Sequence, residues 1–144
     1  MSPRQCKACD KELRTRDKVR IARSMRRYAE SNPYRVWATG TIRNHVKKGF
    51  RLLFTSAELA FWAAKTPDCE ICGCPLNYAF GTKAGLSVPR SPTMDRTDGN
   101  RDSYTLSDIQ IVCFQCNTTK GARSMAEFLH YCNHIALKHS ERLR

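Results

Sequence analysis

A chain of 144 residues with a hydrophobic fraction of 41% is long enough for one domain with an appended arm, and it is too apolar for outright disorder. The formal net charge of +12 is unevenly placed: residues 1–54 hold 15 Lys and Arg against 4 Asp and Glu, whereas residues 55–144 hold 10 against 9. This asymmetry predicts a polyanionic partner, because clustered cations gain free energy by releasing counterions from phosphates. A membrane partner is not expected, since the basic segment lacks a Trp-, Phe- and Leu-rich face.

The cellular compartment bears on how the eight cysteines are interpreted. The start of the chain, Met1 to Lys11, is charged and lacks the apolar run of a secretory signal. No stretch approaches the roughly 18 apolar residues that a membrane span needs. We therefore expect a cytoplasmic location, where cysteines are metal ligands more often than disulfides.

Residues 1–54 are predicted to form a basic helical arm. A Cys6-x-x-Cys9 knuckle opens it, and residues 17–50 have a helical pattern that Asn32-Pro33 and Gly40 interrupt. A narrow apolar stripe runs through the first half of this pattern, as is typical of a helix that lies on a core or on nucleic acid; it consists of Val19, Ile21, Met25 and Tyr28. The candidate phosphate-binding side chains are Arg20, Arg23, Arg26, Arg27, Arg43, Lys47 and Lys48.

Residues 55–144 are predicted to hold the second part of the chain. The capping-box pattern Thr55-Ser-Ala-Glu58 predicts a helix over residues 55–65. Turn-forming residues then surround two strand-like runs, Pro92–Arg96 and Leu106–Phe114. A second capping box, Ser124-x-x-Glu127, begins a C-terminal helix with an apolar stripe at helical spacing; the stripe is Met125, Phe128, Leu129, Cys132, Ile135 and Ala136.

Two Cys-x-x-Cys knuckles are the strongest motif. Four thiolates from Cys69, Cys72, Cys113 and Cys116 can close a tetrahedron around Zn²⁺, which predicts a closed structural site. The 40 residues between the knuckles must loop out and return. Cys6 and Cys9 could hold a second zinc ion or be unliganded, and completing their site needs ligands from the set Cys74, Cys132, His130, His134 and His139. For Cys132, its place on the apolar stripe favours a core residue over a ligand.

The segment around the second knuckle resembles the HNH endonucleases, above all small phage-type proteins and compact cysteine-rich restriction enzymes. The likeness is carried by Ser91-Pro-Thr-Met-Asp95-Arg96-Thr-Asp98-Gly-Asn, by Tyr104-Thr, and by Ile109-Gln-Ile-Val-Cys113-Phe-Gln-Cys116-Asn117-Thr-Thr-Lys120. It covers about residues 69–128 and extends loosely back through residues 32–37 to Lys48-Gly49. The resemblance implies an α+β fold with a zinc-stapled ββα-metal (His-Me finger) core, between the basic helical arm and the C-terminal helix. It also implies a phage or bacterial host cell.

The resemblance also implies a catalytic metal site. Asp95 on the first strand and Asn117 at the start of the following helix would offer oxygen ligands to Mg²⁺ or Mn²⁺. Three departures from the common family pattern matter: Arg96 stands where the general-base histidine is usual, Asp108 where an asparagine braces the hairpin, and Asn117 where a histidine is common. An arginine with a pKa above about 12 cannot accept a proton from water, but Arg96 can bind the scissile phosphate. A carboxylate at Asp108 can only accept hydrogen bonds.

Another residue must therefore act as the general base. His45 is preferred because it lies among phosphate-binding residue types in Arg43-Asn-His-Val-Lys-Lys48, and Tyr104 is the alternative. The remaining histidines lie in the C-terminal helix, where a solvated face is expected. Lys120, one turn after Asn117, is expected to contact a phosphate.

The function predicted from the sequence is a metal-dependent DNA endonuclease or nickase with Zn²⁺ as structural cofactor and Mg²⁺ or Mn²⁺ as catalytic cofactor. The alternative is a non-catalytic zinc-containing module that binds DNA or RNA. Arg96 and Asp108 favour this alternative, because both depart from the catalytic pattern of the family. A homodimer would suit double-strand cutting at a palindrome.

Overall fold

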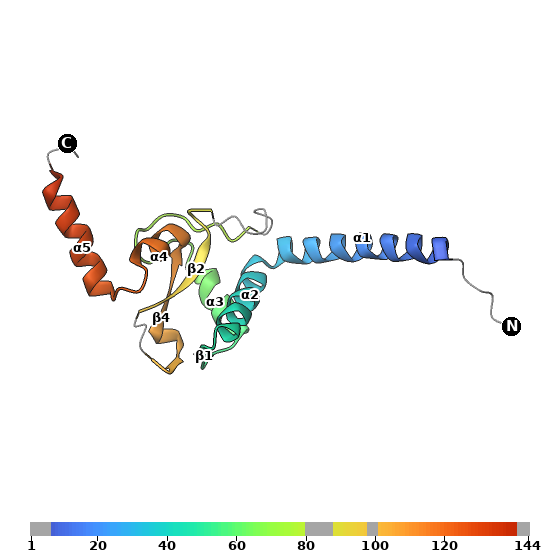
Figure 1. The fold of residues 1–144 in the computed structure, drawn as a ribbon, viewed down its shortest axis with the longest axis horizontal. Coiled ribbons are helices and arrows are strands. Elements are labelled where there is room, and N and C mark those ends of the chain that lie inside the picture. Colours follow the sequence, from blue (N-terminus) through green and yellow to red (C-terminus); the bar gives the residue numbers. More distant parts are fainter. Residues whose placement is uncertain (1–6, 80–87, 98–100, 141–144) are drawn as a thin grey trace.

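Two helices project from a mixed α+β body in the computed structural model, which describes residues 7–79, 88–97 and 101–140. Helix α1 (Lys7–Ser31) extends to one side of the body, and helix α5 (Met125–Lys138) extends to the other (Figure 1). Among the described residues, two small sheets, three further α-helices and one 3-10 turn lie between them. Cys6 lies outside the described residues, and so does the side chain of Cys9, so the predicted second zinc site lies outside them too.

Helices α1 and α2 (Pro33–Lys47) are separated at Asn32. Pro33 occupies the first turn of α2, where its missing N–H leaves no hydrogen bond unmade. The predicted interruption at Gly40 is wrong, because α2 continues through it. A glycine costs a helix only about 1 kcal/mol, and the core contacts of Trp37 and Ala38 on α2 offset that cost. The apolar stripe of α1 is exposed along its length, so α1 does not lie on the core.

Helix α3 (Ser56–Lys65) begins where the sequence predicted. The N–H of Glu58 donates to the Thr55 hydroxyl at 3.2 Å, and the N–H of Thr55 donates to the Glu58 carboxylate at 2.7 Å. The reciprocal pair satisfies two of the backbone donors that a helix start leaves unpaired. The same arrangement joins Ser124 and Glu127 at the start of α5.

Strand β2 (Pro92–Arg96) pairs antiparallel with strand β4 (Ile109–Cys113), and helix α4 (Phe114–Lys120) follows directly. A second pair joins β1 (Arg51–Leu52) to β3 (Ser103–Tyr104) in parallel. The predicted strand 106–114 is therefore too long at both ends.

The first three residues of the predicted strand 106–114 instead form a 3-10 turn, Leu106–Asp108. The turn forms because the Asp108 carboxylate accepts hydrogen bonds from the N–H and the hydroxyl of Thr105, at 2.8 and 2.6 Å. Arg101 adds a third donor at 2.6 Å, and together these donors lower the pKa of Asp108. Asp108 thus braces the connection between β2 and β4 as an acceptor.

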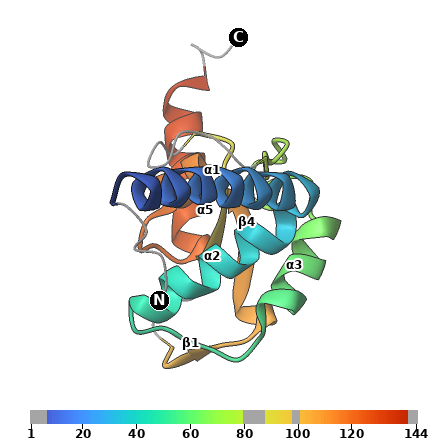
Figure 2. The same cartoon turned by 90° about the vertical axis from the view of Figure 1, so that its right-hand side faces the viewer.

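The two faces of the β2–β4 pair have different neighbours. Alternation along the strands places Met94 and Ile111 on one face, where they pack with residues of α2 and α3 in the main core. Figure 2 shows α2 and α3 next to each other, in front of β4. The largest fully buried side chains of that core are Leu59 and Tyr104. Asp95 and Gln110, which pair across the strands, lie on the opposite face, toward α4. Helix α2, assigned to the arm by sequence, is therefore part of the body.

Helix α5 departs from its prediction. The stripe at helical spacing predicts a core-facing helix, but within α5 only Phe128 is buried, and Leu129, Cys132 and Ile135 are exposed. The helix leaves the body after its first turn (Figure 1), so the stripe has no body surface to pack against. The interpretation of Cys132 as a core residue is wrong for this reason.

Candidate functional site

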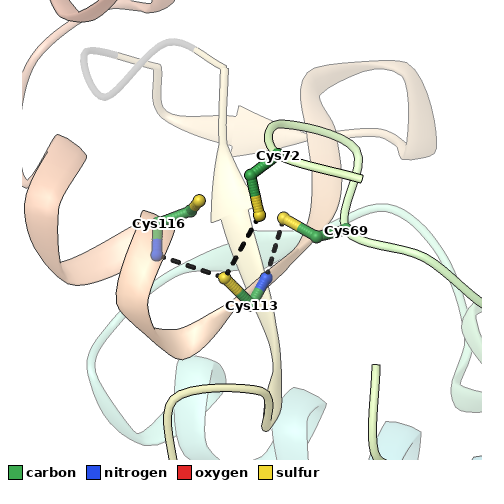
Figure 3. A group of neighbouring side chains, drawn as sticks. All are labelled: Cys69, Cys72, Cys113 and Cys116. Carbon is green, nitrogen blue, oxygen red and sulfur yellow. Dashed lines mark hydrogen bonds between the residues drawn. The ribbon is translucent and has the colours of Figure 1, made fainter. Parts of the chain in front are cut away.

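Four cysteines gather at one end of the β2–β4 pair. Cys69 and Cys72 lie in the loop after α3, Cys113 ends β4 and Cys116 lies in the first turn of α4 (Figure 3). Their sulfur atoms all lie within 4.8 Å of one another, and the Cys72 and Cys113 sulfurs are 3.9 Å apart. A Zn²⁺ tetrahedron with bonds of about 2.3 Å has edges of about 3.8 Å. The four cysteines predicted from sequence can therefore hold a metal ion, and their spacing is compatible with structural zinc.

Hydrogen bonds to sulfur and to the backbone fix this cluster. The N–H of Cys113 donates to the Cys69 sulfur at 3.2 Å, and the N–H of Cys116 donates to the Cys113 sulfur at 3.3 Å, so Cys113 also caps α4. Glu70 docks the first knuckle on β4: its N–H donates to the Ile111 carbonyl at 3.1 Å, and its carboxylate accepts from the Ile111 N–H. These bonds fix the positions of the two knuckles relative to each other.

The thiols of the cluster differ in acidity. A backbone N–H from Cys74 lowers the pKa of Cys72 to about 6, whereas burial raises the pKa of Cys116. A cation must therefore displace protons from some of the thiols, and its affinity falls as the pH falls.

The predicted catalytic carboxylate is buried in an ion pair. The Lys120 ammonium lies 3.2 Å from Asp95 Oδ1, 3.1 Å from its Oδ2 and 3.2 Å from the Arg96 carbonyl oxygen. Gln110 Nε2 donates to Asp95 Oδ2 at 2.7 Å. The predicted phosphate contact of Lys120 is therefore not what this structure shows: the side chain is only 3% exposed, and its charge is compensated by Asp95.

Asn117, the other predicted metal ligand, is half-buried on α4. It precedes Lys120 by three residues, so the two side chains share a face of the helix. A carboxylate and an amide oxygen are suitable donors for Mg²⁺ or Mn²⁺. As arranged, however, Asp95 does not fit such an ion, because Lys120 and Gln110 already contact both of its oxygens.

Arg96 lies next to Asp95 in the strand but points to the opposite face. Its guanidinium stacks on the Phe50 ring at 4.1 Å and donates from Nη1 to the Tyr104 hydroxyl at 3.2 Å. His45 contacts the same phenylalanine, because the ring centroids of His45 and Phe50 are 5.8 Å apart. Three predicted catalytic residues, His45, Arg96 and Tyr104, thus meet around one phenylalanine that the sequence did not single out.

His45 is held in one tautomer. Its Nδ1 lies 2.9 Å from the Thr41 carbonyl oxygen, which can only accept, so Nδ1 carries the proton and the neutral ring keeps its lone pair on Nε2. Burial lowers the pKa of His45 below its ordinary value of 6.5; the Thr41 bond opposes this shift, and the charges of Lys48 and Arg96 add to it. The imidazole is therefore neutral at pH 7.

The predicted DNA-binding side chains occupy two places. Arg20, Arg23 and Arg27 recur along one face of α1 at helical spacing, joined by Arg16, and all four are exposed. Arg26 lies off this face and pairs with Glu30 at 2.9 Å.

On α2 the exposed Arg43 and Lys47 are each two residues from His45, hence about 200° away around the helix. Exposed Lys48 follows the end of α2. Packing of α2 in the core of the body places His45 beside Arg96. Binding of Arg43 and Lys47 to one DNA strand is not needed for this placement.

Comparisons of this chain with protein-family models, with curated proteins and with solved structures returned no match. Over the described part of the chain, no helix combines the length and the apolar character that a membrane crossing requires.

Proposed function

We propose that this chain is a metal-dependent DNA endonuclease or nickase of the HNH type, with zinc in its four-cysteine cluster. The observation that carries the proposal is the chain order: a strand with Asp95, an antiparallel partner strand, and a helix with Asn117 immediately after the cysteine cluster. In the family that the sequence resembles, the ββα unit presents its catalytic groups in this order. Asp95 and the α4 face that bears Asn117 meet on one side of the sheet.

The second support is the Arg96 cluster on the other face of β2. A guanidinium has five N–H donors, and the phenol of Tyr104 takes one from Arg96, so a phosphate oxygen can accept from another. His45 Nε2 can take the proton of the attacking water, and Arg96 can offset the charge that develops on the phosphate. Tyr104 is fully buried, which leaves His45 the better base.

Binding of DNA is assigned to the basic face of α1, with Arg16, Arg20, Arg23 and Arg27, and to the exposed cations of α2. Exposed ion pairs such as Arg20–Asp17 at 3.4 Å contribute little to stability, so a phosphate can replace the carboxylate at small cost. The log–log dependence of affinity on salt should therefore be steep, with a slope near −0.9 per phosphate neutralised.

Plasmid cleavage tests the enzymatic proposal. Wild-type protein incubated with supercoiled plasmid and Mg²⁺ or Mn²⁺ should give nicked or linear DNA, and a chelator should stop the reaction. Asp95→Asn and Asn117→Ala should abolish cleavage while DNA binding is retained. Matched exposed controls are Asp68→Asn and Asn133→Ala, which should cut like the wild type. Wild-type rates in either active-site variant would contradict the assigned site.

A second candidate is favoured by one observation, the occupation of Asp95 by Lys120. A zinc-containing module that binds DNA without cutting it could keep this ion pair permanently. It predicts retarded but intact plasmid at every metal concentration, and competition with RNA would identify its preferred nucleic acid.

A further inference from the structure

The aromatic ring of Phe50 lies at the centre of the Arg96 cluster. The Arg96 guanidinium, from β2, is stacked 4.1 Å from the centroid of this ring, and the centroid of the His45 ring, from α2, is 5.8 Å away. The Tyr104 ring, from β3, meets it edge-on at 6.1 Å. Three elements therefore contact one side chain, which has no group that could take part in hydrolysis itself.

The turn after α2 fixes where this ring lies. The His45 carbonyl accepts from the N–H of Lys48 at 3.0 Å and from the N–H of Phe50 at 3.1 Å. The Val46 carbonyl accepts from the N–H of Gly49 at 3.0 Å. Gly49 has a φ of 87°, a conformation that glycine adopts without a steric penalty. This tight turn brings Phe50 back toward α2 and against the ring of His45.

Arg96 is held by aromatic groups and not by a carboxylate. Its guanidinium also lies 5.5 Å from the centroid of the Tyr104 ring and donates to the Tyr104 hydroxyl at 3.2 Å. Among the described residues, no Asp or Glu forms an ion pair with Arg96. A cation on an aromatic face can still pair with an anion, whereas a salt bridge would first have to break. The Phe50 ring therefore restrains the Arg96 side chain without neutralising its charge.

This restraint matters if Arg96 and His45 act on one phosphate group. An arginine that moves freely in solvent loses rotamer entropy when it binds, and that loss adds to the barrier of the reaction. Stacking on Phe50 imposes the loss when the protein folds, before DNA arrives. The charge of Arg96 is close enough to His45 to contribute to lowering its pKa, so the two groups belong to one small site.

We propose that Phe50 is a positioning residue, whose ring holds the Arg96 guanidinium and the His45 imidazole in fixed relative positions for a single phosphate of the DNA backbone. The inference rests on the proposed function, in which Arg96 binds the phosphate and His45 takes the proton of water. In this role Phe50 touches neither the phosphate nor the water and acts through its two neighbours. The face of the ring is what counts, and an aliphatic side chain does not supply it.

Substitution of the ring tests the proposal. In single-turnover cleavage of a duplex with Mg²⁺, Phe50→Leu should be about 3- to 30-fold slower, the range expected for loss of a cation–π contact. Its affinity for the duplex without Mg²⁺ should be unchanged, because the basic face of α1 carries most of the binding. Phe50→Tyr keeps the ring face and should recover most of the wild-type rate. A structural role alone would lower the melting temperature without changing the rate of the folded protein.

Exchange of the Arg96 Nε–H with water is a second readout that needs neither DNA nor Mg²⁺. Followed by nuclear magnetic resonance on the full zinc-loaded chain, this proton should exchange more slowly than the Nε–H of exposed Arg23 on α1. Phe50→Leu should bring its exchange closer to that of Arg23. Phe61→Leu is the matched control, because it removes a cation–π contact of the same length, 4.1 Å from Lys65 to the Phe61 ring on α3, and should change neither readout.

The outcomes separate this inference from the nuclease proposal. A folded Phe50→Leu that cuts like the wild type, a Phe50→Tyr as slow as Phe50→Leu, or a wild-type Arg96 Nε–H that exchanges like that of Arg23 would overturn the positioning role, even if plasmid is cut. Slow exchange that Phe50→Leu accelerates, without cleavage by the wild type, would support the positioning role and refute the nuclease. Zinc content and circular dichroism show whether Phe50→Leu has folded; if it has not, Phe50→Tyr and the wild-type comparison of Arg96 with Arg23 decide.

Discussion

Removal of one cysteine of the cluster is the sharpest test of the predicted zinc site. Cys113 is the most informative position, because it ends β4, caps α4 and accepts the N–H of Cys116. Cys113→Ser replaces a thiolate by a hydroxyl, which is a poor ligand for Zn²⁺. The change therefore removes the ion while altering side-chain volume very little.

The expected magnitude follows from how little else holds this end of the body. The apolar cluster around the cysteines has only three buried members among the described residues, Cys69, Val112 and Cys113, and two of them belong to the cysteine group that could hold a metal ion. Structural zinc contributes about 10–16 kcal/mol of binding free energy in small domains. A whole domain has a net stability of about 5–15 kcal/mol. Loss of the ion is thus comparable to the total stability, and the body should unfold at 25 °C.

Elemental mass spectrometry and thermal melting followed by circular dichroism measure the two consequences. The wild type should contain at least one zinc per chain and melt cooperatively, whereas Cys113→Ser should lose zinc and show no cooperative transition. Cys132→Ser, which alters an exposed cysteine on α5, is the matched control and should keep both properties. A zinc-free protein that melts at the same temperature as the zinc-loaded one would refute the reasoning.

Three further predictions concern the base, the arm and the core. His45→Ala should slow cleavage about 10²- to 10⁴-fold with metal content unchanged. The lowered pKa of His45 keeps its ring neutral, so the wild-type single-turnover rate should be level above pH 6.5 and fall as the pH drops through that pKa. A pH profile that His45→Ala leaves unchanged would exclude His45 as the base. Arg23→Gln with Arg27→Gln should reduce the salt slope of DNA binding by about 0.9 for each phosphate that the variant no longer neutralises, and an unchanged slope would remove α1 from the interface. Leu59→Ala should lower the free energy of unfolding by about 2–5 kcal/mol in chemical denaturation, whereas exposed Leu53→Ala should change it little; equal effects would mean that the core is wrongly located.

Local features of the fold were legible in the sequence. The strand Pro92–Arg96 and both predicted capping boxes occur where the residue pattern placed them. Such features depend on residues a few positions apart, whose geometry the backbone itself dictates. The four cysteines also meet as predicted. Each Cys-x-x-Cys knuckle offers only two thiolates, so two knuckles are needed to complete one four-thiolate metal site.

Contacts between distant segments were decided only by the tertiary structure. Lys120 and Asp95 are 25 positions apart, and the register of β2 on β4 together with the start of α4 at Phe114 brings the ammonium to the carboxylate instead of to solvent. His45 approaches Arg96 because both pack on Phe50, a residue without any functional signature of its own. The apolar stripe of α5 predicts burial correctly only if a surface lies opposite it, and the chain path after α4 carries α5 away from the body. Periodicity specifies which face of an element is apolar, whereas packing specifies what that face meets.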